Sequence, residues 1–139
     1  MKSLSVAVGV ILIGLAIFGY TEVWGADWRR ISKGENSLEY YDAEGITRSS
    51  KNIVKVSLKS VYTEEGKIDA VRKLGKRFEK VSYEIHSLEI DCSNKKIRFL
   101  SSNYYSQDDK VITSHKRTTK WDLIAPESIG EVLFKNVCK

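Results

Sequence analysis

The sequence is poor in the residue types from which catalytic and metal sites are usually built. Its 139 residues include two cysteines, two histidines and one proline. A zinc site takes three or four protein ligands, and neither His86 nor His115 has a cysteine or aspartate at ligand spacing. Serine is frequent, but no serine stands in the G-x-S-x-G pattern of a nucleophile elbow. We therefore expect a protein that is not an enzyme and that holds neither a metal nor a cofactor.

The N-terminal segment has the pattern of an export signal. Lys2 supplies a positive charge, and the run from Leu4 to Phe18 is apolar and contains no charged residue. Val23 and Gly25 suit the −3 and −1 positions of a cleavage site. The apolar run is about 15 residues long, shorter than the roughly 20 that a spanning helix needs. We therefore predict a cleaved signal peptide over residues 1–25 and a mature protein without a stable membrane span.

The remaining residues, 26–139, have the size of one domain and contain no repeat or low-complexity linker. The formal net charge is +5, and it stays so in the mature part because Lys2 and Glu22 leave together. A basic exported protein can meet anionic surfaces such as sulfated glycans or lipid headgroups. The same charge can also serve solubility alone. Export argues against a nucleic-acid partner.

Both cysteines lie in the predicted mature domain. Compartments beyond the inner membrane are oxidising, so an exported chain with two thiols most simply carries one disulfide. Redox-active pairs are usually close in sequence, whereas Cys92 and Cys138 lie far apart. A structural disulfide is therefore the preferred interpretation, and a redox pair is the alternative.

Alternating apolar and polar residues predict a sheet. The clearest strand is Ile53–Tyr62, in which Val54, Val56 and Leu58 share one face with Ser60. Short turns between the later strands indicate an antiparallel meander. The further expected strands are Trp28–Ile31, Leu38–Asp42, Ser82–Cys92, Ile97–Ser106 and Val111–Lys116.

The period changes to that of a helix over Lys67–Lys80. The expected apolar stripe consists of Ile68, Val71, Leu74, Phe78 and Val81. The opposite arc is basic, and it is our candidate site for an anionic partner: Arg72, Lys73, Lys76, Arg77 and Lys80. The alternative is a solvated helix face with no ligand. A second, weaker basic cluster contains Lys116, Arg117, Lys120 and Trp121.

A second helix is predicted over Ile129–Val137. Ser128 and Glu131 fit a capping box, in which the hydroxyl accepts from the Glu131 amide and the carboxylate reaches back. Cys138 would then meet Cys92 at a strand end. The residues expected to face the sheet are Ile129, Val132, Leu133 and Val137. The predicted fold class is α+β: an antiparallel sheet with an amphipathic helix and a C-terminal helix, stapled by one disulfide.

Two tyrosine pairs, Tyr40–Tyr41 and Tyr104–Tyr105, fall on predicted strands. Successive strand residues point to opposite faces, so one ring of each pair should lie in the core. Tyr104 or Tyr105, or one of the two histidines, could serve as an axial ligand of heme. A heme-binding protein is therefore an alternative, although sheet-surface histidines are the simpler interpretation.

Four patches together resemble the surface-adhesin protein E family of bacterial envelope proteins. They extend over nearly the whole mature chain, and their order and the final cysteine carry the resemblance. The patches are Trp28 with Tyr40-Tyr41-Asp42 and Ile46; Val54–Tyr62; Ile90-Asp91-Cys92 with Lys96-Ile97-Arg98, Leu100-Ser101 and Tyr104; and Trp121 with Ile124-Ala125-Pro126, Ser128-Ile129-Gly130-Glu131, Lys135 and Val137-Cys138.

The resemblance implies an antiparallel sheet with a helix packed on it and a disulfide from a strand to the terminal region. It also implies binding of host matrix and plasma proteins, and a heme-binding role has been attached to the family. The named members are lipoproteins, whereas no cysteine stands near the cleavage site here.

Three function hypotheses result. The first is an exported, non-enzymatic protein at the periplasm or cell surface that binds an extracellular or envelope protein or an anionic polysaccharide. The alternatives are a periplasmic small-ligand or heme-binding protein and an accessory subunit of an envelope complex.

Overall fold

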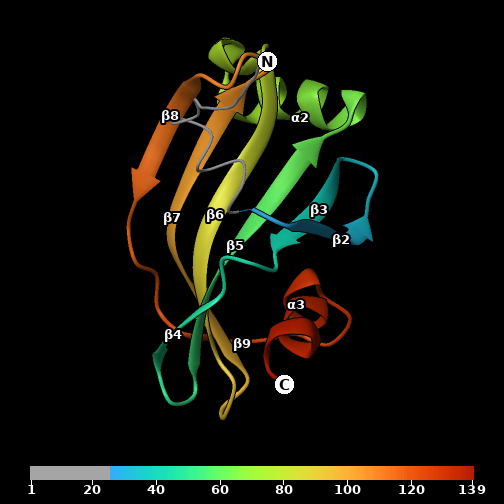
Figure 1. Ribbon diagram of the computed structural model, residues 1–139. Helices are drawn as coiled ribbons and strands as arrows, with labels where there is room; N and C mark the ends of the chain where they lie inside the picture. The colour runs from blue at the N-terminus through green and yellow to red at the C-terminus, as the bar shows by residue number, and fades with distance from the viewer. Residues whose placement is uncertain (1–25) are drawn as a thin grey trace, which may run out of the picture.

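The computed structural model describes residues 26–139 (Figure 1). The predicted signal peptide, residues 1–25, lies outside the described residues. The described chain forms an antiparallel sheet of eight strands with two α-helices, which confirms the predicted α+β class. The strands are β2 (Trp28–Lys33), β3 (Ser37–Asp42), β4 (Thr47–Ser50), β5 (Ile53–Tyr62), β6 (Val81–Asp91), β7 (Lys96–Ser106), β8 (Val111–Lys116) and β9 (Asp122–Leu123).

The strand order is β2-β3-β5-β6-β7-β8, so neighbours in the sheet follow one another along the chain as the meander prediction required. Two short strands were not predicted. β4 pairs with the start of β5, and β9 pairs with the start of β7. All four residues of β4 and both residues of β9 are exposed. Such strands carry no buried apolar alternation, which is why the sequence pattern does not reveal them.

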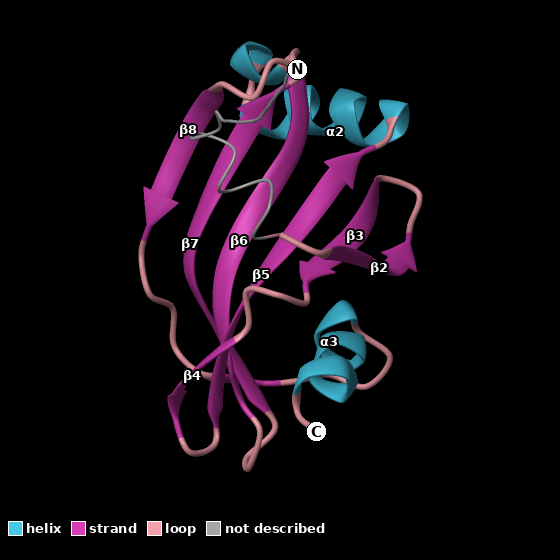
Figure 2. Ribbon diagram, viewed as in Figure 1, coloured by secondary structure: helices cyan, strands magenta, loops and turns pink. Residues whose placement is uncertain are grey.

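The helices α2 (Glu64–Leu74) and α3 (Ile129–Val137) lie toward opposite ends of the sheet (Figure 2). The main core lies under α3. There Val54 and Val56 of β5 pair with Ile90 and Leu88 of β6, and Leu133 of α3 completes the cluster. All five side chains are at most 1% exposed. Burying a side chain of this size contributes about 1.5–3 kcal/mol, so this cluster contributes strongly to the stability of the fold.

The helix α3 begins and ends where the capping pattern predicted. The Ser128 hydroxyl accepts from the Glu131 amide at 3.1 Å. The Glu131 carboxylate accepts from the Glu127 amide at 3.0 Å rather than from Ser128, so the return bond of the box reaches one residue further back. The predicted apolar face was too wide. Leu133 and Val137 are buried, whereas Ile129 and Val132 remain 37% and 36% exposed.

The predicted helix over Lys67–Lys80 was wrong at both ends. The α2 helix starts at Glu64 because the Thr63 hydroxyl accepts from the Gly66 amide and caps the helix one turn earlier. It ends at Leu74 because Gly75 has a φ of 107°, a value that side-chain-bearing residues rarely adopt. A separate 3₁₀ turn, η2 (Lys76–Phe78), follows.

The predicted apolar stripe was right only in part, since Val71 is half-buried and packs against the cluster of Ala70, Phe78 and Val81, whereas two other members are exposed. Ile68 is 63% exposed and Leu74 is 48% exposed, whereas the helix buries Gly66 and Ala70. The reason is a close backbone approach, since a Cβ at Gly66 would lie 1.9 Å from the carbonyl oxygen of Asn36. Small residues therefore face the sheet. Phe78 and Val81 are buried as expected, but they belong to η2 and to β6.

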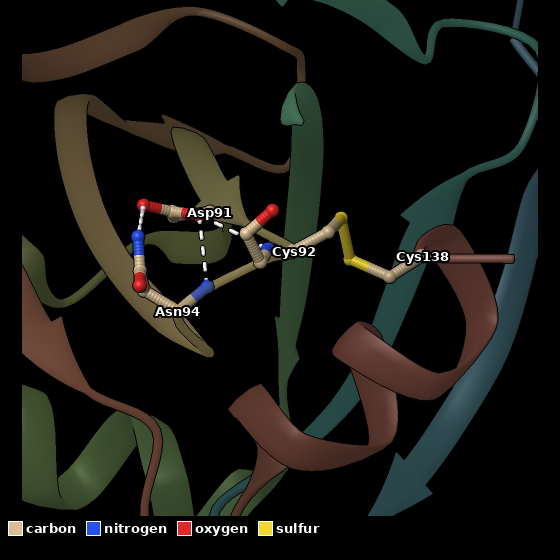
Figure 3. The surroundings of a disulfide bond; sticks show 5 residues. Asp91, Cys92, Asn94 and Cys138 are labelled. Atoms are coloured by element: carbon tan, nitrogen blue, oxygen red, sulfur yellow. Dashed lines mark hydrogen bonds between the residues drawn. A yellow bond between two sulfur atoms is a disulfide. The ribbon is translucent and has the colours of Figure 1, made fainter. Parts of the chain in front are cut away.

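The predicted disulfide is present between Cys92 and Cys138, with Cα atoms 5.6 Å apart (Figure 3). It joins the residue after β6 to the residue after α3. The turn beside it is ordered by Asp91, which accepts from the backbone amides of Ser93 and Asn94 and from the Asn94 side chain. The hydrogen bonds from Asn94 hold the pKa of Asp91 below its ordinary value. The disulfide therefore connects the end of α3 to the end of β6, beside a hydrogen-bonded turn.

Candidate functional site

The structure divides the five cations predicted to form one basic face. Arg72 and Lys73, in the last turn of α2, both pair with Asp69, at 3.5 and 3.1 Å. The helix ends before the other three, so Lys76, Arg77 and Lys80 lie on η2 and the residues after it. The five cations therefore do not share one helix, as the prediction required.

These three cations line one hollow of about 520 Å³, which we call the η2 hollow; its other lining residues are Glu79, Ser106 and Ile112. Within residues 26–139, none of the three forms an ion pair. The Arg77 guanidinium lies 5.5 Å from the centre of the Phe78 ring. Because Phe78 is 3% exposed, a core residue supports the cationic wall of the hollow.

The weaker basic cluster is also divided. Lys116 and Arg117 line a different hollow of about 730 Å³ together with both histidines. Trp121 instead lies under the guanidinium of Arg98, whose central carbon is 4.4 Å from the centre of the tryptophan ring. Arg98 pairs with Glu89 at 2.7 Å. The sequence analysis missed Arg98 as the partner of Trp121 because the two residues meet across the sheet and not along the chain.

The two histidines lie in one row on the same face of the sheet. Ser102 of β7 pairs with His86 on one side and with His115 on the other. Adjacent strands are about 4.8 Å apart, so the two histidines are separated by about twice that distance. Within residues 26–139 no three residues of the His, Cys, Asp and Glu types are grouped as metal ligands would be.

His86 is held by a carboxylate. Its Nε2 atom lies 2.9 Å from Oε2 of Glu84, and its Nδ1 atom is buried without a hydrogen-bond partner in the described residues. One nitrogen is thus engaged by Glu84 and the other is buried, an arrangement that does not suit axial ligation of heme. His115 is exposed on the edge strand β8.

Glu84 belongs to a buried polar row that the sequence analysis missed. Glu39, Ser60 and Glu84 are 5%, 9% and 8% exposed, and they face inward on three neighbouring strands. Ser37 and Ser60 both donate to the Glu39 carboxylate. The available signal was an acid at an inward position of a strand, since Glu39 alternates with Tyr41.

The environment of Glu84 favours its charged form. Burial alone would raise the pKa, but the hydrogen bond and charge of His86 and the hydrogen bonds from Tyr104 and Tyr62 together outweigh it. The pKa of Glu84 is therefore lowered. Burial, followed by the nearby charge of Glu84, raises the pKa of Tyr104 to about 12 and also raises that of Tyr62. Both phenols consequently remain donors.

Each tyrosine pair divides between the two faces, as predicted. Tyr41 is 6% exposed and lies in the core, and Tyr104 packs edge-on against Phe78 at 5.2 Å. On the outer face, Tyr105 stacks on Tyr83 with ring centres 4.7 Å apart. The ammonium of Lys59 lies 4.5 Å from the centre of the Tyr83 ring. The outer aromatic residues are thus already engaged by one another and by a lysine.

No helix of the described part of the chain is long and apolar enough to cross a membrane. A family model described as surface-adhesin protein E matches residues 28–139. No curated protein and no solved structure matches the chain. The matched span covers every strand and helix described above.

Proposed function

Because the chain belongs to the surface-adhesin protein E family, we propose that it is an exported, non-enzymatic binding protein of the bacterial envelope. Its segment 1–25 is removed as a signal peptide in this proposal. Its partner carries negative charge, either as an acidic stretch of an extracellular protein or as an anionic polysaccharide. The family supports binding of an external partner, and the surface of the chain supports the sign of its charge.

The observation that carries this proposal is the η2 hollow. Lys76, Arg77 and Lys80 converge on it without an ion pair in the described residues, whereas Arg72 and Lys73 share Asp69 as an ion-pair partner. An exposed ion pair contributes about 0.5 kcal/mol. Three such contacts would together contribute about 1.5 kcal/mol, which corresponds to roughly tenfold in affinity. The interaction would weaken as salt rises, because exposed charges are screened.

The test compares two double variants with the same change in net charge. Heparin serves as the anionic probe, and neutral dextran serves as the negative control. We expect Lys76→Glu with Arg77→Glu to weaken heparin binding at least about tenfold at low salt, because each change removes a favourable contact and also adds a repulsive charge. We expect Arg72→Glu with Lys73→Glu to weaken it much less, because those cations are held by Asp69.

Equal losses in the two double variants would show that heparin responds to net charge alone and would overturn the η2 hollow as the site. Binding that persists in both variants and in high salt would overturn the anionic partner altogether. Location is tested separately by adding protease to intact cells, with a known periplasmic protein as control. Loss of this chain alone would place it at the surface, and survival of both proteins would confine it to the periplasm.

A further inference from the structure

A second recess lies on the inward face of the sheet, beneath the first turn of α3. Its volume is about 300 Å³, and most of its walls are hydrocarbon: Leu58, Leu88, Ile97, Phe99, Ile129 and Leu133. The only polar side chains that line it belong to Glu39, Ser60 and His86. Glu39 and Ser60 are already hydrogen-bonded to each other. We call this recess the α3 pocket. Its chemistry suits an apolar group.

The hollow of about 730 Å³ adjoins the α3 pocket on the same face, and we call it the β8 hollow. Its lining is cationic and rich in hydroxyl groups, and it includes no carboxylate. The residues that determine this character are Ser102, Ser114, His115, Lys116, Arg117 and Thr119. The loop that carries Arg117 is held against β7, since Thr119 exchanges two hydrogen bonds of 2.9 Å with the backbone of Phe99.

His86 and Phe99 line both recesses, so the apolar one and the cationic one lie side by side. The two rings pack edge-on with centres 5.3 Å apart. The 2.9 Å contact with Glu84 orients the imidazole, and its Nδ1 atom has no hydrogen-bond partner in the described residues. Phe99 remains 36% exposed at this boundary. The boundary is therefore a rigid, partly apolar rim.

From this juxtaposition we infer that the chain binds a single-chain amphiphilic anion. The hydrocarbon chain lies in the α3 pocket, and the carboxylate or phosphate head lies in the β8 hollow beside Lys116 and Arg117. A small group such as a water molecule takes about 30 Å³, so the α3 pocket accommodates about ten methylene-sized groups. A diacyl lipid has two longer chains and does not fit. The ligand class is thus a medium-chain fatty acid or a monoalkyl phosphate.

This inference concerns a different site from the η2 hollow and does not depend on the proposed function. The first test is a chain-length series of alkyl carboxylates binding to the disulfide-bonded mature protein, followed by calorimetry. Each added methylene should tighten binding about fourfold until the α3 pocket is filled near ten carbons, after which the affinity should level off. Decyl phosphate should bind as decanoate does, whereas decanol and decyltrimethylammonium should bind at least tenfold more weakly.

Two matched pairs of variants locate the ligand. Ile129→Trp should fill the mouth of the α3 pocket and weaken decanoate binding more than tenfold. Val132→Trp should leave it unchanged, because Val132 is equally exposed on the same helix but does not line the pocket. Arg117→Glu, in the β8 hollow, should weaken binding, whereas Lys120→Glu, which makes the same charge change in the same loop, should not.

Several results would overturn the inference. One is equal binding of all four decyl compounds, and another is an affinity that does not change with chain length. A third is an equal loss of decanoate binding in the two variants of either matched pair. Co-sedimentation with vesicles of diacyl phosphatidylglycerol that is lost in Ile129→Trp would overturn the single-chain ligand. Heparin binding should be unchanged in Ile129→Trp, so failure of this site and failure of the η2 hollow are distinguishable.

Discussion

The Nε2 atom of His86 lies 2.9 Å from Oε2 of Glu84, and the two side chains project from the same face of β6, two positions apart. Their strand runs between the α3 core and the cluster under α2. The pair therefore provides a charged, hydrogen-bonded segment in the middle of an otherwise apolar face. It is also the part of the fold whose stability should respond most clearly to acid.

We predict that Glu84 makes the protein lose stability in acid. Burial raises its pKa, but the hydrogen bond and charge of His86 and the hydrogen bonds from Tyr104 and Tyr62 together outweigh burial, so the folded-state pKa lies below the ordinary value of 4.5. The contribution is therefore fully present above about pH 4.5 and is lost as the pH falls through the lowered folded-state pKa. Urea unfolding measured from pH 6 to pH 3 should give a shallower loss of unfolding free energy for Glu84→Gln than for the natural chain.

Glu44→Gln is the control for that measurement, since Glu44 is an exposed residue and its side chain forms no ion pair within residues 26–139. A residual acid dependence will remain in Glu84→Gln because Asp91 and Asp108 also have lowered pKa values. Identical pH profiles for the natural chain and for Glu84→Gln would contradict the assigned role of the His86 contact.

Removal of the disulfide should destabilise the protein strongly. Cys92 and Cys138 close a loop with a sequence separation of 46, for which loop-closure entropy predicts a contribution of about 4 kcal/mol. The variant Cys92→Ser with Cys138→Ser should therefore unfold at a much lower urea concentration than the oxidised protein. The reduced natural chain is the matched control, and it should behave like the double variant.

An intact mass that shows two free thiols in the exported protein would refute the bridge. A double variant as stable as the oxidised chain would show that α3 docks without help from the covalent link. In that case the apolar contacts of Leu133 and Val137 would be sufficient to hold the helix.

Two glycines should respond to alanine in opposite directions. At Gly66 the new Cβ would lie 1.9 Å from the backbone oxygen of Asn36, so α2 must move away from β3. We expect Gly66→Ala to lower the unfolding free energy by about 2 kcal/mol. At Gly130 the nearest atoms would lie at 3.5 Å, an ordinary contact, and Gly130→Ala should raise it by about 0.5 kcal/mol through helix propensity.

Chemical denaturation of the two glycine variants and the natural chain checks both signs in one experiment. If Gly66→Ala did not destabilise the protein, α2 would not pack closely against Asn36, in the turn before β3. Its buried residues, Gly66 and Ala70, would then not be explained by close packing.

Several elements could be predicted because their signals are local. The alternation in β5 and the Ser128–Glu131 cap each depend on residues within a few positions, and both are found at the predicted places. The disulfide could be predicted because the composition left one possible partner for each thiol. The α2 helix was mispredicted because Thr63 was not recognised as its cap and Gly75 was placed inside it.

The amino-acid sequence by itself determined the class of fold, the main strands, the terminal helix and its staple. Side-chain period, capping chemistry and cysteine number act over short distances or through simple pairing, so they can be recognised without coordinates. Only the tertiary structure decided which cations remain without an ion pair, which face of α2 is buried, and that His86, Phe99 and Arg117 lie around one pair of recesses. These features depend on strand register and on helix docking, and both join residues that are distant along the chain.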